Sequence, residues 1–206
     1  MKYWPLRGAA VEGGVTVGAG GILVVLSGPS GVGKTAVSER LVKEDGIVRA
    51  ITTTTRAPRE REQDGVDYHF LDRAAFERQV AEGGFLEHAE VHGNLYGSPK
   101  VAIEKQRLSS RAVLLLIDVQ GAELLRSGQV DMLTIFLEPP GEEELKRRIA
   151  ARGDENDEMM DLRLRNALSE IAEKNKYDHC IVNDDLEDCV EQIDSIIEAD
   201  LRSRGQ

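Results

Sequence analysis

One stretch of sequence decides the fold of this chain: Ile22-Leu23-Val24-Val25-Leu26-Ser27-Gly28-Pro29-Ser30-Gly31-Val32-Gly33-Lys34-Thr35. Its first half is apolar and predicts a buried strand, and its second half matches G-x-x-x-x-G-K-[ST] at every fixed position. Glycines let the backbone curl so that successive N–H groups point inward at phosphate oxygens. Lys34 adds a positive charge for the β- and γ-phosphates, and Thr35 offers a hydroxyl to Mg²⁺. The stretch therefore predicts a binding site for a nucleoside triphosphate, formed by Gly28, Pro29, Ser30, Gly31, Val32, Gly33, Lys34 and Thr35.

Length and charge limit the remaining possibilities. The chain has 206 residues, which suits one domain with a sizeable core. Its 26 Lys and Arg residues against 37 Asp and Glu residues give a net charge of −11. An acidic balance of this kind argues against broad nucleic-acid binding, which needs a basic face. We therefore expect the cations that hold phosphates to be concentrated locally.

Targeting signals and cysteine chemistry are not expected. No apolar run approaches the length of a membrane span, so no membrane association is predicted. Residues 1–20 are rich in glycine and are interrupted by Glu12, so we interpret them as a flexible tail without a signal peptide. Cys180 and Cys189 lack metal-ligand spacing. They are expected to be reduced thiols of a cytoplasmic protein.

Apolar strands alternate with helical patterns after residue 21. The strand at residues 22–27 precedes a predicted helix from Gly33 to about Lys43, and further apolar runs cover 112–117, 132–137 and 180–182. Short runs that are apolar on both faces and separated by helices predict an α/β protein with a central parallel sheet. The final helix repeats apolar residues at helical spacing and is expected to pack on the core: Leu186, Val190, Ile193, Ile197 and Leu201.

Two segments interrupt this alternation. Residues 52–99 are rich in Thr, Arg, Gly and Tyr, with short strand-like pieces around one helix capped by Asp72. More than half of residues 141–165 are charged. We expect the first segment to bind a second substrate and the second to act as a mobile cover. The predicted organisation is thus a tail (1–20), a P-loop core (21–51, 100–140 and 166–206), a substrate-binding region (52–99) and a lid (141–165).

Several separated motifs, in matching order and spacing, resemble those of guanylate kinases. They are Thr53-Thr54-Thr55-Arg56-Ala57-Pro58-Arg59, Asp64-Gly65-Val66-Asp67-Tyr68-His69-Phe70, Phe85-Leu86-Glu87, Gly93-Asn94-Leu95-Tyr96-Gly97-Ser98, Ile117-Asp118-Val119-Gln120-Gly121, and Tyr177-Asp178 leading to Ile181-Val182-Asn183-Asp184-Asp185. The resemblance covers residues 21 to about 202. It implies a nucleoside-monophosphate-kinase-like parallel sheet flanked by helices, with a small mixed GMP-binding insertion and a helical lid. It also implies Mg²⁺-dependent transfer of the γ-phosphoryl group of ATP to GMP or dGMP in purine nucleotide metabolism, by a monomer or homodimer.

The resemblance assigns the acceptor phosphate to Arg56, Arg59, Tyr68 and Tyr96. The residue types agree with this assignment. A nucleoside monophosphate carries a dianionic phosphate at neutral pH because its second pKa is about 6. Two arginines three positions apart can present two guanidinium forks to one phosphate, and the tyrosines can donate hydroxyl hydrogen bonds.

The guanine base is assigned to Glu87 and Asp118, with hydroxyl contacts from Thr52 and Ser98. Guanine presents N1–H and an exocyclic NH₂ group side by side, which a carboxylate can accept together. Adenine has an unprotonated N1 and lacks that amino group, so a buried carboxylate would lose its donors. A site of this kind is expected to reject adenine strongly.

The resemblance also supplies the residues expected at the transferred phosphoryl group. Lys34 is joined by Arg152 and Arg163 from the lid, with Arg148 as a helper, while Asn183 is placed near the donor adenine and Thr35 at the metal. The acceptor phosphate is already ionised, so positioning and electrostatics are expected to carry the catalysis.

The sequence departs from the family pattern at two informative positions. Leu116 stands where members usually carry an aspartate near the phosphates, and Arg61 replaces a glycine. Two other functions stay open at this stage. One is a non-catalytic binding module, although such modules typically lose the P-loop and lid residues present here. The other is a kinase for a different phosphorylated acceptor, which the paired carboxylates Glu87 and Asp118 disfavour.

Overall fold

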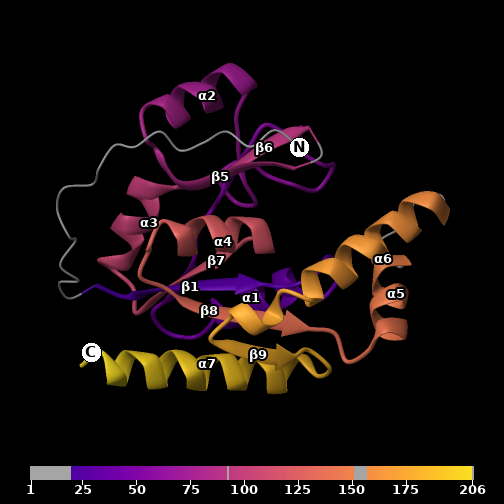
Figure 1. Ribbon diagram of the computed structural model, residues 1–206. Coiled ribbons are helices and arrows are strands. Elements are labelled where there is room, and N and C mark those ends of the chain that lie inside the picture. Colours follow the sequence, from indigo (N-terminus) through magenta and orange to yellow (C-terminus); the bar gives the residue numbers. More distant parts are fainter. Residues whose placement is uncertain (1–19, 92, 151–156, 206) are drawn as a thin grey trace.

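The computed structural model describes residues 20–91, 93–150 and 157–205, and its main feature is a parallel sheet (Figure 1). Within these residues, five strands pair in the order β2-β7-β1-β8-β9, and every pairing is parallel. Their bounds are β1 Ile22–Ser27, β2 Ile47–Arg49, β7 Ala112–Leu116, β8 Leu133–Glu138 and β9 His179–Val182. The α/β class and the parallel sheet predicted from the apolar runs are confirmed.

Helices cover both faces of this sheet, and the alternation of side chains along β1 explains how. Ile22, Val24 and Leu26 point into a core shared with α1 (Lys34–Leu41) and α7 (Leu186–Ser203). The intervening Leu23 and Val25 point into a second core with α3 (Lys100–Arg107) and α4 (Val119–Ser127). A strand buried on both faces needs apolar residues at every position, which is why β1 has no polar alternation.

A smaller sheet lies above the first and belongs to residues 53–99. Its order is β4-β3-β6-β5, with bounds β3 Thr53–Thr54, β4 His69–Phe70, β5 Phe85–Val91 and β6 Asn94–Pro99. The helix α2 (Arg73–Ala81) packs on it through Phe76, whose ring stacks on Phe85 at 4.6 Å between centroids. The expected cap is present, because the Asp72 side chain accepts from the Ala75 backbone N–H at 2.7 Å.

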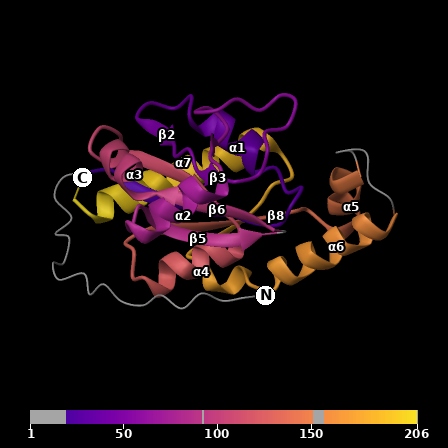
Figure 2. The same ribbon diagram turned by 90° about the horizontal axis from the view of Figure 1, so that it is seen from above.

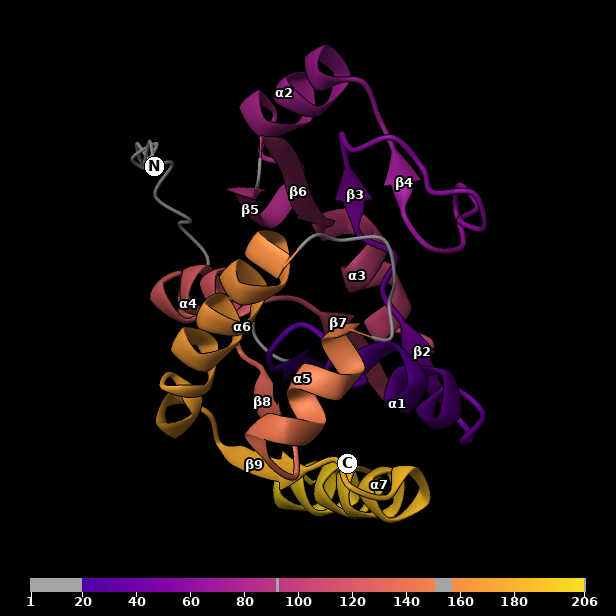
Figure 3. The same cartoon turned by 90° about the vertical axis from the view of Figure 1, so that its right-hand side faces the viewer.

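The helices α5 (Glu142–Ala150) and α6 (Asp157–Ile171) project from the edge of the main sheet toward which the strands point (Figures 1 and 2). Leu145, Ile149 and Ala167 form a small core between them. Figure 3 shows this pair in front of the carboxyl ends of the strands. The boundary expected at residue 165 falls inside α6, which continues without interruption to Ile171.

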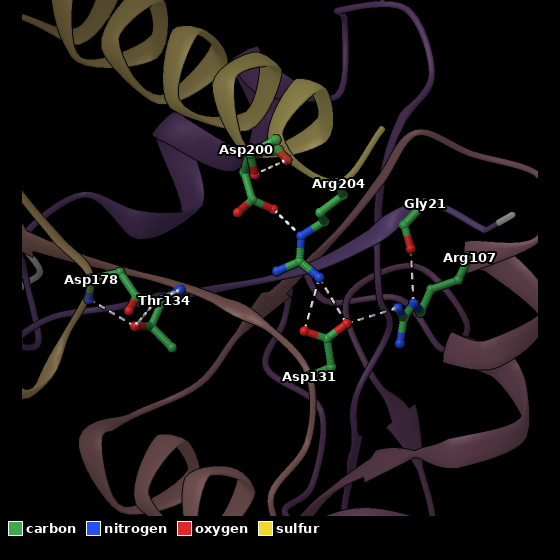
Figure 4. Close-up of polar contacts among 8 residues, drawn as sticks. Gly21, Arg107, Asp131, Thr134, Asp178, Asp200 and Arg204 are labelled. Atoms are coloured by element: carbon green, nitrogen blue, oxygen red, sulfur yellow. Dashed lines mark hydrogen bonds and ion pairs between the residues drawn. The ribbon is translucent and has the colours of Figure 1, made fainter. Parts of the chain in front are cut away.

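Polar contacts tie together the opposite, amino-terminal edge of the main sheet (Figure 4). Arg204, just past α7, donates to both carboxylate oxygens of Asp131 at 2.8 Å each and to Asp200 at 2.5 Å. Arg107 at the end of α3 donates through Nε to the Gly21 carbonyl at 2.8 Å. Each of these pairs is partly exposed and contributes little stability alone. Together they close one edge of the sheet, and the opposite edge carries the P-loop.

The motif Tyr177-Asp178 has a structural role in this arrangement. The Asp178 carboxylate accepts from the backbone N–H and the hydroxyl of Thr134 at 2.8 and 2.6 Å (Figure 4). Tyr177 packs in the second core with Phe136. The pair therefore fixes the start of β9 against β8, after a short 3₁₀ turn (η1, Lys174–Lys176). Among the described helices, none is both long and apolar enough to cross a lipid bilayer.

Candidate active site

The P-loop joins β1 to α1 with the backbone that the motif predicts. Gly28 and Gly33 have φ values of 141° and 104°, where side chains are strained. A Cβ atom at Gly28 would lie 2.5 Å from the Leu137 carbonyl oxygen, and one at Gly33 would lie 2.4 Å from the Asn183 Nδ2 atom. Both glycines are therefore required by conformation and by close packing. No side chain caps α1 at Gly33, which leaves the first N–H groups of the helix suited to an anion.

Lys34 and Thr35 form the first turn of α1. The Lys34 ammonium donates to the carbonyl oxygens of Gly28 and Pro29, the latter at 3.1 Å, so it lies against the P-loop backbone. The Thr35 side chain is exposed. A hydroxyl in this position fits Mg²⁺, which is commonly held by one or two protein ligands together with substrate phosphates and water. Among the described residues, no group of three His, Cys, Asp or Glu side chains forms an alternative metal site.

Asn183 and Arg148 hold the outer side of the P-loop. The buried Asn183 amide donates to the Val32 carbonyl oxygen at 2.8 Å. Arg148, on α5, donates through Nη1 to the carbonyl oxygens of Asn183 at 3.0 Å and Val32 at 3.3 Å, and through Nε to Glu144 at 2.6 Å. Both residues thus contact the loop backbone, a role that the sequence did not predict. Their expected contacts with ATP stay predictions.

The structure describes one of the two arginines expected in the lid. Arg152 lies outside the described residues. Arg163 lies on α6 and is half-buried. Their assignment to the transferred phosphoryl group stays a prediction for both.

Glu170, near the end of α6, was not singled out from the sequence. Burial raises the pKa of its carboxyl group, while the charge of Lys34 and a backbone hydrogen bond from Ser30 oppose that rise. The charge of Asp118 acts on Glu170 as well. The carboxylate therefore lies between the P-loop and the start of α4. Only the fold brings it there, because 140 positions separate Ser30 from Glu170.

The residues expected to recognise guanine meet at the junction of the two sheets. Glu87 on β5 is buried, and the Ser98 hydroxyl on β6 donates to its Oε1 atom at 2.5 Å. Burial raises the pKa of Glu87 to about 7; the Ser98 bond opposes this rise and the charge of Asp118 adds to it. Ser98 is the one side-chain donor to this carboxylate within the described part of the chain, so the carboxylate retains acceptor capacity for a ligand. Thr52, half-buried, lies just before β3.

Asp118 has a structural task besides the expected one. Its Oδ1 atom accepts from the Gly121 backbone N–H at 2.8 Å and so caps α4. The strand register places Asp118 at the edge of the sheet that holds the P-loop. Leu26 of β1 pairs with Leu116 of β7, and Gly28 and Asp118 each follow two residues later. Asp118, one of the residues expected to recognise guanine, and the P-loop therefore lie at the same edge of the main sheet.

The residues expected at the acceptor phosphate lie around the loop between β3 and β4. The Arg56 guanidinium lies 5.6 Å from the centre of the Tyr68 ring, and the rings of Tyr68 and Tyr96 are 6.3 Å apart. Burial lowers the pKa of Arg56, but the hydrogen bonds to Glu62 and Tyr96 outweigh it and raise the value. Arg59 is 72% exposed at its side chain. The structure thus brings Arg56, Tyr68 and Tyr96 together, while the Arg59 side chain extends into solvent.

Leu116 occupies the last position of β7, is partly buried and packs against the first core. The departure from the family aspartate therefore replaces a carboxylate with an apolar contact. Arg61, the other departure, lies in the exposed part of the β3–β4 loop.

Comparison with known proteins agrees with this geometry. The guanylate kinase family model matches residues 21–200. The chain is 46% identical to the guanylate kinase of Clostridium perfringens over 87% of its length and 84% of the relative's. It is 40% identical to that of Rickettsia bellii, over 90% of this chain and 97% of the relative. A crystal structure of guanylate kinase from Anaplasma phagocytophilum superposes with a TM-score of 0.73 at 36% identity, covering 89% of this chain and 88% of that one. The chain belongs to the guanylate kinase family.

Proposed function

We propose that this protein transfers the γ-phosphoryl group of ATP to GMP or dGMP and forms ADP with GDP or dGDP. The observation that carries the proposal is the buried Glu87 carboxylate, which accepts from Ser98 and interacts with the charge of Asp118. Asp118 in turn lies at the edge of the main sheet that also holds the P-loop. A buried carboxylate with unused acceptor capacity fits the paired N–H groups of guanine. The P-loop fits the phosphates of a nucleoside triphosphate.

In this proposal each region of the chain has one task. The core (21–51, 100–140 and 166–206) binds ATP through the P-loop and Lys34, and Asn183 with Arg148 keeps that loop in place. Residues 52–99 bind GMP, with its phosphate at Arg56, Arg59, Tyr68 and Tyr96 and its base at Thr52, Glu87, Ser98 and Asp118. Residues 141–165 form the lid that supplies Arg152, and Arg163 belongs to the same cover.

The chemistry needs no strong general base, because the acceptor phosphate is already ionised at neutral pH. The task of the protein is to bring two polyanions together and to stabilise charge on the transferred group. Lys34 and the P-loop amides hold the donor, and the arginines offset charge on both phosphates. Thr35 would help to hold Mg²⁺, which neutralises charge on the donor phosphates when it is bound.

Retention of Lys34 and Thr35 supports catalysis over a non-catalytic binding module. The free thiols of Cys180 and Cys189 fit the proposed cytoplasmic location, and small nucleotides are the proposed partners. Monomer and homodimer both remain compatible with the proposal.

A coupled assay of ADP formation with GMP, dGMP, AMP and UMP tests the proposal. We expect activity with GMP and dGMP and little with AMP or UMP. A purified protein that binds GMP but forms no ADP at any Mg²⁺ concentration would favour the binding module. Faster turnover with another monophosphate would replace GMP as the acceptor.

A further inference from the structure

Glu62, in the loop between β3 and β4, contacts both arginines expected at the acceptor phosphate. Its two carboxylate oxygens accept from Arg56 Nη2 at 2.8 and 2.9 Å. One of them also accepts from the Arg59 backbone N–H at 2.8 Å. The Glu62 side chain is only 16% exposed, so these contacts are shielded from solvent. Glu62 is not among the residues assigned to substrate binding above.

The two arginines differ in how firmly they are held. Arg56 is held by Glu62, by the Ala57 carbonyl at 2.7 Å and by the face of the Tyr68 ring. Its backbone N–H also donates to the Thr54 hydroxyl at 3.1 Å. By contrast, the Arg59 guanidinium lies 3.9 Å from Glu62 and is mostly exposed. Glu62 therefore helps to hold the guanidinium of Arg56, whereas at Arg59 its hydrogen bond is to the backbone.

We propose that Glu62 is a positioning residue that orients Arg56, and the backbone at Arg59, for the phosphate of the acceptor nucleotide. The inference rests on the proposed function, because it concerns the same substrate. A free arginine side chain loses rotamer freedom when it binds a phosphate, and this loss weakens binding. The Arg56 side chain, which Glu62 already orders, has lost this rotamer freedom before GMP binds, so binding is weakened less.

A simple electrostatic argument predicts the opposite effect, which makes the proposal testable. A carboxylate beside a binding site for a dianion repels the ligand, so its removal should tighten GMP binding. If positioning dominates, removal should weaken GMP binding. The sign of the change therefore decides between the two effects.

The experiment compares Glu62→Gln with Glu62→Asp, which keeps the charge but shortens the reach. Glu60→Gln is the matched control, because Glu60 lies in the same loop, is exposed and makes no ion pair within the described part of the chain. GMP and guanosine, which lacks the phosphate, are titrated calorimetrically into each protein without ATP. Initial rates then give kcat and the KM for GMP and for ATP.

We expect Glu62→Gln and Glu62→Asp to weaken GMP binding by about tenfold or more, the usual loss for a charge-assisted hydrogen-bond pair. Guanosine affinity, KM for ATP and the kcat at saturating GMP should stay within about threefold, and Glu60→Gln should match the parent. Unchanged or tighter GMP binding in Glu62→Gln would overturn the inference. So would an equal loss for GMP and guanosine, which would mean that the whole region is disturbed. A parent protein that binds GMP but lacks kinase activity would refute the proposed function without affecting this comparison.

Discussion

The raised pKa of Glu87 predicts that guanine binding depends on pH in a range where an ordinary carboxyl group does not titrate. Burial places the pKa of this group at about 7, against a usual 4.5. Only the ionised form offers acceptors to both N1–H and the exocyclic amino group. Because the pKa is raised, protonation competes with the ligand as the pH falls through 7. Binding should therefore weaken on acidification.

The magnitude follows from the fraction of ionised Glu87. With a pKa near 7, the apparent affinity should fall about tenfold between pH 8 and pH 6. A carboxyl group with the ordinary value of 4.5 would change the affinity by only a few per cent, roughly, over this range. The two cases are thus clearly separated.

Guanosine is the ligand for this measurement, because the phosphate of GMP titrates near pH 6 and would obscure the effect. Its inhibition constant against GMP is measured at each pH, at constant ionic strength. Glu87→Gln is the control: it should bind guanosine on the order of 10²-fold more weakly at pH 8 and show no pH dependence. A flat profile for the parent between pH 6 and pH 8 would refute the buried, ligand-accepting carboxylate.

Four further outcomes are expected. Without ligand, the parent should lose stability relative to Glu87→Gln as the pH rises from 4.5 to 7, since folded Glu87 holds a proton that the unfolded chain releases. Urea unfolding should show that the difference in the free energy of unfolding changes by about 3 kcal/mol in total. Lys34→Met should lower kcat by on the order of 10³-fold without changing the Tm, because the ammonium donates to the Gly28 and Pro29 carbonyls and belongs to neither apolar core of the sheet. Turnover within a few-fold of the parent would contradict its role. Asn183→Ala should raise the KM for ATP about tenfold and leave that for GMP unchanged, and equal increases would argue against a role confined to the P-loop. Leu116→Asp should lower the Tm, because it removes a partly buried apolar contact. It should also lower the Mg²⁺ concentration needed for half-maximal rate, at equal or higher turnover, and an unchanged Mg²⁺ requirement would contradict the idea of a missing carboxylate.

The parts of the site that are local in sequence could be predicted from it. The P-loop is one continuous motif, so its strand, its glycines and the start of α1 follow from neighbouring residues. The helix cap at Asp72 is local in the same way. Apolar runs predicted the parallel sheet because strands buried on both faces need no polar alternation.

The parts of the site that depend on contacts between distant residues could not be predicted from the sequence. Asn183 and Val32 are 151 positions apart, and nothing near either residue indicates their hydrogen bond. Glu170 and Glu62 lie in charged segments, where a carboxylate usually means only a solvated surface. The pairing of Glu87 with Asp118 came from the family resemblance. Its geometric reason is that α4, which Asp118 caps, packs against β5, which carries Glu87.

A common charge arrangement links the two nucleotide sites. Three cations that are expected to meet a phosphate have a carboxylate beside them: Lys34 interacts with Glu170, Arg56 with Glu62, and Arg148 with Glu144. Hydrogen bonds from Arg147 and Arg148 lower the pKa of Glu144 to about 2, so that partner stays ionised at neutral pH. This arrangement explains how a chain of net charge −11 can bind polyanions. The local cations need no basic surface around them, because internal carboxylates fix their positions and limit their repulsion of one another before substrate binds.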